Sequence, residues 1–427
     1  MNKFLIEGGI PLKGEIIPSG NKNAALPLLA ACLLTEDDVI LNNVPNIRDV
    51  ADMRRLLESL GVEIANTGSS SWKIRAKDLC PSELDPEVCK KIRASILLAG
   101  PMVARVGDLK LPPPGGDIIG RRRLDTHILA LEALGAEVKY DRMFEFSAKS
   151  GLCGADILLD EASVTGTENA IMAAVLAKGT TIIRNAASEP HIQELCKMLN
   201  KFGAQVENIA SNTLIIDGVE RLKGGEFDIG PDYLEVVSYI GAAVVTNGEV
   251  RIKDAAPDYL NMIRIVFNRM GVDWSIDGND ILVPSNQELV IQPDIGNAIP
   301  EIKTNVWPAF PTDLMSIAIV VATQAKGSIL FHDWMYPSRM YFTDKLGGMG
   351  AQIVLCDPHR CIVQGPTELY GETMESPDIR AGMALLLASL AAKGQSTIRN
   401  IEQIERGYEN VEGKLRNLGA SIERREQ

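Results

Sequence analysis

Met53-Arg-Arg-Leu-Leu-Glu-Ser-Leu-Gly-Val-Glu-Ile64 is the stretch of sequence that decides the fold, because its pattern recurs. Its apolar residues suit one face of a helix, Gly61 stands where a helix end needs a left-handed residue, and an alternating strand follows. The same pattern returns five times, at 128–138, 195–206, 263–274, 343–353 and 414–422. Successive turn glycines are 68 to 79 residues apart, so the sequence predicts six repeated units.

Between these copies lie short apolar strands ending in turns, at 180–187, 248–256, 327–334 and 395–401. The other connecting segments are helices that are apolar nearly all round, at 24–34, 171–177, 314–325 and 383–392. Helices of that kind are buried in a domain centre. We therefore expect an α/β protein of two lobes, each with three units, with helices inside, sheets around them and a seam near 231–235.

Composition agrees with two lobes and limits the function. A chain of 427 residues that is 46% apolar is too long for one ordinary core. Its net charge of −13 argues against non-specific nucleic-acid binding, which needs a basic surface. The seven cysteines are scattered without a Cys-x-x-Cys pair, and no histidines pair at metal-ligand spacing. With no signal-peptide core and no apolar run of membrane-spanning length, we expect a cytoplasmic protein without metal.

The segment 111–125, LPPPGGDIIGRRRLD, combines a stiff start with a permissive turn and carries one acid before three arginines. A lone carboxylate, Asp117, beside clustered guanidinium groups suits a site that binds an anion and moves a proton. The alternative is a solvated turn with surface arginines.

Other charged residues gather at the starts of the apolar helices. Asn23 is a plausible N-cap, which would leave Lys22 at the positive end of a helix dipole. Arg93 leads a second helix, Asp313 opens or caps a third, and similar positions are held by Asp378, Arg380 and Arg406. Each has a capping or solvated interpretation taken alone, but several together indicate a shared anion site.

These segments resemble the enolpyruvyl transferase family. The likeness runs from Phe4 to about Arg424 and is carried by SGNKNAALP (19–27), IRASILLAGPMVARVG (92–107), PGGDIIGRRRLDTHI (114–128), ASVTGTENAIMAA (162–174), PAFPTDL (308–314), DIRAGMALLLA (378–388) and RGYENVEGKLRNLGASIER (406–424). It implies two inside-out α/β barrel-like domains of three repeated units each. The first lobe would be 21–232 with the 111–125 loop, the second 1–20 with 233–427, and the active site would lie in the cleft between them.

The resemblance also implies an activity. The enolpyruvyl group of phosphoenolpyruvate would be added to the 3-hydroxyl of UDP-N-acetylglucosamine and phosphate eliminated, without a cofactor, as the first committed step of peptidoglycan synthesis. Lys22, Arg122 and Arg406 match the cations around phosphoenolpyruvate, and Asn23 matches a residue close to the reacting groups. Asp313 matches the carboxylate proposed to accept the hydroxyl proton. The remaining matches are sugar-nucleotide contacts or active-site residues: Arg93, Arg122, Arg123, Leu124, Asp125, Thr126, Ser163, Val164, Met335, Arg339, Asp378 and Arg380.

Asp117 departs from the family, most of whose members carry a cysteine there as general acid and as the thiol that fosfomycin alkylates. We expect a catalytically competent, fosfomycin-resistant enzyme, because a carboxylate opens an epoxide more slowly than a thiolate. The segment 334–339 and Tyr233 also depart from the usual pattern. The alternatives are therefore another acceptor, such as shikimate 3-phosphate or a nucleotide, and a non-catalytic paralogue that binds UDP-sugars.

Overall fold

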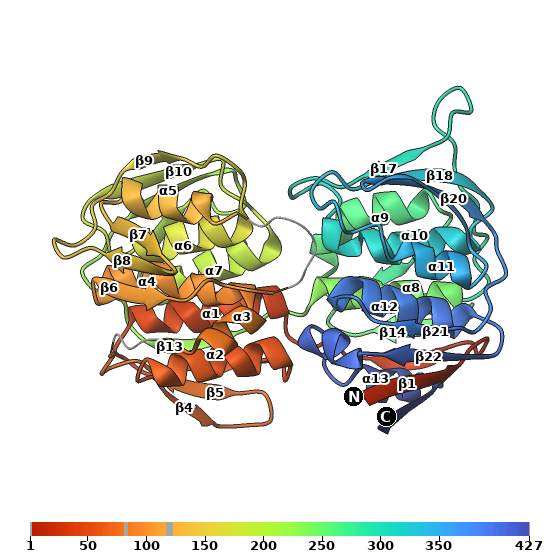
Figure 1. Cartoon of the computed structure of the whole chain (residues 1–427), viewed down its shortest axis with the longest axis horizontal. Helices are drawn as coiled ribbons and strands as arrows, with labels where there is room; N and C mark the ends of the chain where they lie inside the picture. The colour runs from red at the N-terminus through yellow and green to blue at the C-terminus, as the bar shows by residue number, and fades with distance from the viewer. Residues whose placement is uncertain (1, 81–83, 117–122, 427) are drawn as a thin grey trace. The chain divides into compact units, whose positions relative to one another are not determined.

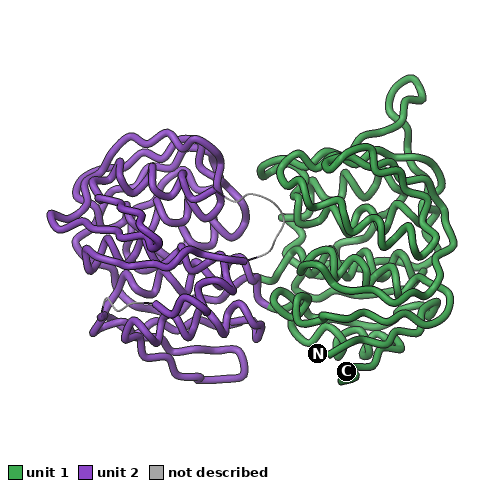
Figure 2. Tube along the Cα trace, viewed as in Figure 1, with its two compact units in different colours: residues 1–19, 118–121, 231–427 green, residues 20–117, 122–230 purple. Residues whose placement is uncertain are grey.

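The structure, a computed structural model, describes residues 2–80, 84–116 and 123–426. Contacts within the chain divide these residues into two units (Figure 2). Unit 1 comprises residues 2–19 and 231–426, and unit 2 comprises the described residues between 20 and 230. The chain thus changes unit after Ser19 and again after Gly230. The crossings were expected near Asn21 and Asp232.

Unit 2 is built around apolar helices that are almost wholly buried: α1 (Lys22–Ala31), α4 (Ala99–Arg105) and α6 (Val164–Ala174). Three sheets surround them, in the orders β13 (Gly225–Asp228), β3 (Val39–Asn42), β5 (Trp72–Arg75), β4 (Glu63–Asn66); β6 (Asp108–Leu111), β8 (Met143–Ser147), β7 (Glu137–Asp141); and β11 (Gln205–Glu207), β12 (Thr213–Asp217), β10 (Thr180–Arg184), β9 (Asp156–Leu158). The other helices are α2 (Arg48–Ser59), α3 (Pro86–Lys91), α5 (Asp125–Ala133) and α7 (Pro190–Lys201).

Unit 1 repeats this plan around α8 (Tyr233–Val245), α10 (Met315–Gln324) and α12 (Ile379–Ala391), which pack against one another. Its sheets run β15 (Ser275–Asp277), β16 (Asp280–Val283), β14 (Glu249–Ile252), β2 (Lys13–Ile16); β17 (Glu301–Lys303), β18 (Gly327–His332), β20 (Arg360–Gly365), β19 (Gln352–Asp357); and β21 (Thr373–Glu375), β22 (Gln395–Arg399), β1 (Asn2–Glu7), β23 (Ser421–Glu426). The remaining helices are α9 (Asn261–Asn268), α11 (Thr343–Gly348) and α13 (Val411–Asn417).

The inside-out α/β architecture is confirmed. All 13 residues of α8 are buried, and each unit has its own apolar core. In unit 1, β17, β18 and β20 lie on one side of the buried helices and β21, β22 and β1 on the other (Figure 1). A helix that is apolar on all sides is stable at the centre of a unit, because none of its faces meets water there.

The six turn glycines behave as predicted. Their φ angles lie between +80° and +104°, in the region that favours glycine, and each is followed within four residues by a strand: β4, β7, β11, β15, β19 or β23. Each preceding helix ends two or three residues before its glycine, where the chain turns toward the strand.

The two crossings are fixed on both sides by hydrogen bonds inside each unit. In unit 2, the Asn21 N–H donates to the Gly230 carbonyl at 2.8 Å, and the Gly230 N–H donates to the Glu194 carboxylate at 3.0 Å. Glu194 is 7% exposed, so this bond is shielded from water.

In unit 1, the Asp232 N–H donates to the Ser19 carbonyl at 2.8 Å, and the Ser19 N–H donates to the Glu235 carboxylate at 2.7 Å. Glu235 is 2% exposed and pairs with Lys414 at 2.5 Å. Burial raises the pKa of Glu235, and Lys414 opposes that shift.

None of the helices within the described ranges has both the length and the apolar character needed to cross a bilayer.

Candidate active site

The described candidate residues are divided between the two units, and they are presented unit by unit. Asp117 and Arg122 lie outside the described residues. Across the ranges that the structure covers, no three histidine, cysteine, aspartate or glutamate side chains are arranged to hold a metal ion.

Lys22 is the first residue of α1, and the expectation that Asn23 caps this helix is wrong. Asn21 is the N-cap: its Oδ1 accepts the N–H groups of Asn23 at 2.8 Å and Ala24 at 3.3 Å. The helix begins two residues earlier than predicted, because Ser19, Asn21 and Asn23 can each cap a helix and only packing chooses among them.

The ammonium group of Lys22 is buried against Asp49, the second residue of α2, at 2.7 Å. Lys22 is 9% exposed and Asp49 is 4% exposed. A buried ammonium needs such a partner, since an uncompensated charge is costly away from water. The pair therefore fixes the Lys22 Nζ at the start of α1. Asp49 was not foreseen.

The sugar-nucleotide candidates at the start of α5 are tied together by Asp160, which the sequence analysis also missed. Arg93, the first residue of the 3-10 helix η2 (Arg93–Leu98), donates through Nη2 to the Arg123 carbonyl at 2.7 Å. Arg123 pairs with Asp160 at 2.8 Å and with Asp125 at 3.2 Å. The Thr126 hydroxyl donates to Asp160 at 2.7 Å. This bond, together with the hydrogen bond and charge of Arg123, lowers the pKa of Asp160, while burial opposes the shift.

The starts of α5 and α6 approach closely at Gly166. Ser163 caps α6 by accepting the Gly166 N–H at 3.3 Å, and Val164 is the first helical residue. A Cβ on Gly166 would lie 3.0 Å from the Thr126 methyl carbon and 3.1 Å from the Ser163 Cβ. The glycine thus brings Thr126 and Ser163 together, with Leu124 directly before α5.

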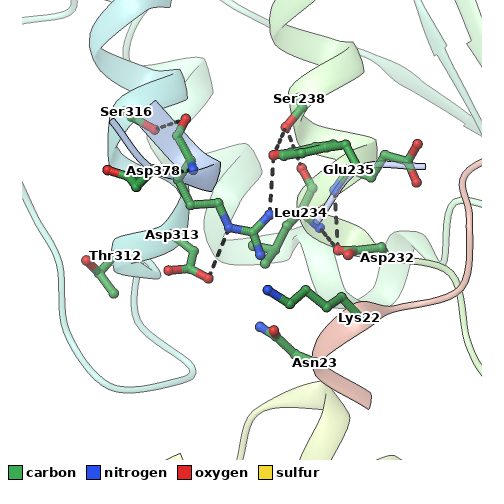
Figure 3. Close-up of polar contacts among 12 residues, drawn as sticks. Lys22, Asn23, Asp232, Leu234, Glu235, Ser238, Thr312, Asp313, Ser316 and Asp378 are labelled. Atoms are coloured by element: carbon green, nitrogen blue, oxygen red, sulfur yellow. Dashed lines mark hydrogen bonds and ion pairs between the residues drawn. The ribbon is translucent and has the colours of Figure 1, made fainter. Parts of the chain in front are cut away.

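In unit 1, Asp313 lies between two buried arginines rather than capping α10. Its Oδ1 accepts from Arg339 Nη2 at 2.7 Å. Its Oδ2 accepts from Arg380 Nε at 3.3 Å, the contact drawn dashed at Asp313 in Figure 3. Each arginine is 5% exposed. Burial lowers the pKa of both guanidinium groups, but neighbouring carboxylates, Asp313 foremost, raise it more, so both remain cationic.

Asp378 and Tyr408 fix Arg380 from two sides. Asp378 caps α12 by accepting the N–H groups of Arg380 at 2.8 Å and Ala381 at 2.9 Å. Arg380 Nη1 donates to the Tyr408 hydroxyl at 3.3 Å, which bonds to Ser238 on α8 at 2.9 Å (Figure 3). Asp378 therefore fixes the Arg380 backbone, and Tyr408 and Asp313 fix its guanidinium group.

Arg406 does not open the last helix, contrary to expectation. It ends the 3-10 helix η5 (Ile401–Arg406), donating to Gln403 at 3.1 Å, and α13 begins only at Val411. Residues 407–410 separate the two helices, and a Cβ on Gly407 would lie 2.6 Å from the Ile379 side chain.

Asp333 is a buried acid directly before the 334–339 segment. It is fully buried; its Oδ2 accepts from the Thr312 hydroxyl at 2.5 Å and its Oδ1 from the Met335 N–H at 3.1 Å. Because Thr312 precedes Asp313, this carboxylate joins the Asp313 segment to the Met335–Arg339 segment. Tyr233, the other departure, is buried with its ring 5.9 Å from Trp307.

Known proteins with similar sequences and folds are enolpyruvyl transferases, the family that the sequence motifs resemble. A sequence model of EPSP synthase (3-phosphoshikimate 1-carboxyvinyltransferase) matches residues 6–415. The chain is 52% identical to the UDP-N-acetylglucosamine 1-carboxyvinyltransferase of Treponema denticola, covering 100% of both, and 55% identical to that of Bradyrhizobium diazoefficiens, covering 99% and 98%. The enolpyruvyl transferase NikO from Streptomyces tendae shares the fold, with a TM-score of 0.88 and 22% identity over 99% of each chain.

Proposed function

Since this chain belongs to the EPSP synthase (3-phosphoshikimate 1-carboxyvinyltransferase) family, we propose that it is a UDP-N-acetylglucosamine 1-carboxyvinyltransferase. It transfers the enolpyruvyl group of phosphoenolpyruvate to the 3-hydroxyl of UDP-N-acetylglucosamine and releases phosphate. The observation that carries this conclusion is identity of 52% and 55% over essentially the whole chain with two proteins of that name.

The reaction is an addition followed by an elimination. The 3-hydroxyl oxygen bonds to the central carbon of phosphoenolpyruvate while the methylene carbon gains a proton. The resulting tetrahedral intermediate loses phosphate, and the new methyl group returns a proton as the double bond re-forms. In our proposal Asp313 takes the hydroxyl proton and Asp117 supplies the proton to carbon.

The cations have the complementary role of holding negative charge. We assign Lys22, Arg122 and Arg406 to phosphoenolpyruvate, whose phosphate and carboxylate need fixed donors. The Lys22–Asp49 pair supports this assignment, because it fixes the ammonium group. Arg339 and Arg380 orient the Asp313 carboxylate. The sugar nucleotide is assigned to the Arg93, 122–126 and 163–164 group.

Phosphate release tests the proposal. Wild-type protein with phosphoenolpyruvate should release phosphate with UDP-N-acetylglucosamine and not with shikimate 3-phosphate. Asp313→Asn should lower kcat at least about 100-fold, within the range expected for general base catalysis. Asp357→Asn, which alters a partly exposed carboxylate paired with Arg360, serves as the matched control. Absence of phosphate with every acceptor would leave the non-catalytic alternative.

Fosfomycin provides a separate prediction. With aspartate at position 117, preincubation with fosfomycin should leave the phosphate-release rate unchanged, whereas Asp117→Cys should be inactivated in a time-dependent manner. An adduct on wild-type residue 117, detected by mass spectrometry, would contradict the expectation.

The proposal also places the enzyme in the cytoplasm at the first committed step of peptidoglycan synthesis, on which cell-wall biogenesis, cell shape, cell cycle and division depend.

A further inference from the structure

Three elements of unit 2 carry the sugar-nucleotide candidates, and a buried polar chain connects them. Arg93 begins η2, Thr126 is in the first turn of α5, and Ser163 caps α6. This pair of hydrogen-bonded side chains consists of Asn169 on α6, which is 0% exposed, and His127 on α5, which is 1% exposed. Neither residue takes part in the chemistry described above.

The orientation of the Asn169 amide follows from two backbone groups. Its Oδ1 accepts the Gly100 N–H at 2.8 Å, and its Nδ2 donates to the Ile96 carbonyl at 2.8 Å. A flipped amide would set donor against donor and acceptor against acceptor. Nδ2 is therefore the atom that faces His127 Nδ1 at 2.8 Å, and it can only donate.

This contact decides the histidine tautomer. His127 Nδ1 accepts from Asn169, so the ring proton is on Nε2, which donates to the Thr165 hydroxyl oxygen at 3.1 Å. Burial, with the nearby charge of Arg93, lowers the pKa of His127 to about 3, which agrees with a neutral ring near pH 7.

The tautomer in turn fixes what Thr165 can do. Its hydroxyl oxygen already accepts from His127, and among the described residues no group accepts the hydroxyl hydrogen. Thr165 is the second residue of α6 and half-buried, so this hydrogen is available to a ligand. A hydroxyl hydrogen that has no acceptor among the described residues can be donated to a phosphate oxygen, which accepts at neutral pH.

We propose that Thr165 donates a hydrogen bond to the diphosphate of bound UDP-N-acetylglucosamine, and that His127 and Asn169 are positioning residues that aim it. The inference rests on the proposed function and adds a binding residue to it. A hydrogen bond to a charged group is among the stronger ones, so its loss should be measurable.

Thr165→Val removes the hydroxyl at nearly constant shape, and Thr165→Ser retains it. The valine variant should raise the KM for UDP-N-acetylglucosamine about tenfold or more, while the KM for phosphoenolpyruvate changes less than about twofold. The serine variant should stay within about threefold of wild type. Thr180→Val, whose hydroxyl bonds to the exposed Asp217, is the matched control. Equal KM values for the valine and serine variants would overturn the proposal.

The positioning role has its own readout. His127→Leu should raise the same KM, and His127→Gln, which keeps a donor near Thr165, should restore it. Adding His127→Leu to Thr165→Val should have no further effect on this KM, because both act through one hydrogen bond. Fully additive effects would mean that His127 does not act through Thr165. If His127→Leu does not fold, as judged by thermal unfolding, the Thr165 pair decides alone.

A binding measurement separates this inference from the proposed function. Titration calorimetry with UDP alone needs neither phosphoenolpyruvate nor turnover. Weaker UDP binding by Thr165→Val than by Thr165→Ser would support the Thr165 assignment even if the wild-type protein released no phosphate. Equal binding by the two variants would contradict it, whatever the activity.

Discussion

At the scale of single residues, Asp333 should matter to catalysis although it is fully buried. Asparagine in its place cannot accept from both Thr312 and Met335, so one partner loses its bond at a cost of about 1–3 kcal/mol. We expect Asp333→Asn to lower kcat about tenfold, because Thr312 adjoins Asp313. Steady-state kinetics and urea unfolding measure the two effects. Unchanged kcat alongside lost stability would limit Asp333 to a structural role.

His127 should make stability depend on acid. Its pKa falls from 6.5 to about 3 on folding, so the unfolded chain binds the proton more readily between these values. The stability contribution is complete above pH 6.5 and is lost as pH falls toward 3. At pH 5 the loss is about 2 kcal/mol. Urea unfolding at pH 7 and 5 should show a smaller difference for His127→Gln than for wild type, and an equal difference would be evidence against a neutral buried His127.

The residues that sequence reasoning missed are those whose role comes from the tertiary fold. Lys22 could be predicted as a site residue because it lies at a helix start. The sequence around it gave no sign of its ion pair with Asp49, which lies on α2. Asp160 and Asp333 looked like ordinary acids until their partners Thr126 and Thr312 were in place. The Asp313 ion pairs likewise need α10, α12 and the 335–339 segment to meet.

At the scale of elements, the turn glycines provide a matched pair. Gly61 and Gly135 both lie in unit 2 with φ of +90° and +98°. A Cβ at Gly135 meets nothing within 4 Å, whereas one at Gly61 would lie 2.6 Å from the Asp78 carbonyl oxygen. Gly135→Ala should cost about 1 kcal/mol through backbone strain, and Gly61→Ala clearly more. Urea unfolding of the two variants tests this; equal losses would rule out the clash.

The elements themselves could be predicted because the repeat exposes a periodic apolar pattern. Helix starts were less accessible, since Asn21, Asn23 and Ser19 are all capping residues in one short segment. A further difference is the sheet β6–β8–β7. The other five sheets have four strands, one of them a parallel edge strand, but in the described residues this sheet has three. Before η2, where the other units place that strand, the chain forms α3.

At the scale of the whole molecule, the two units should respond separately to damage, because each has its own core. Deleting residues 2–7 removes β1, which pairs with both β22 and β23 in unit 1. Hydrogen exchange should accelerate in α8, α10 and α12 while α1 and α6 of unit 2 stay protected. Equal acceleration in both units would show that they unfold as one.

The placement of β1 also has a consequence for synthesis on the ribosome. This strand is translated long before its partners β22 and β23, which begin only at residues 395 and 421. The nascent chain therefore emerges with an unpaired apolar segment, Phe4-Leu-Ile6, that waits while all of unit 2 is completed. Such a delay exposes a strand to mispairing, so the N-terminal segment is where assistance by chaperones should be needed most.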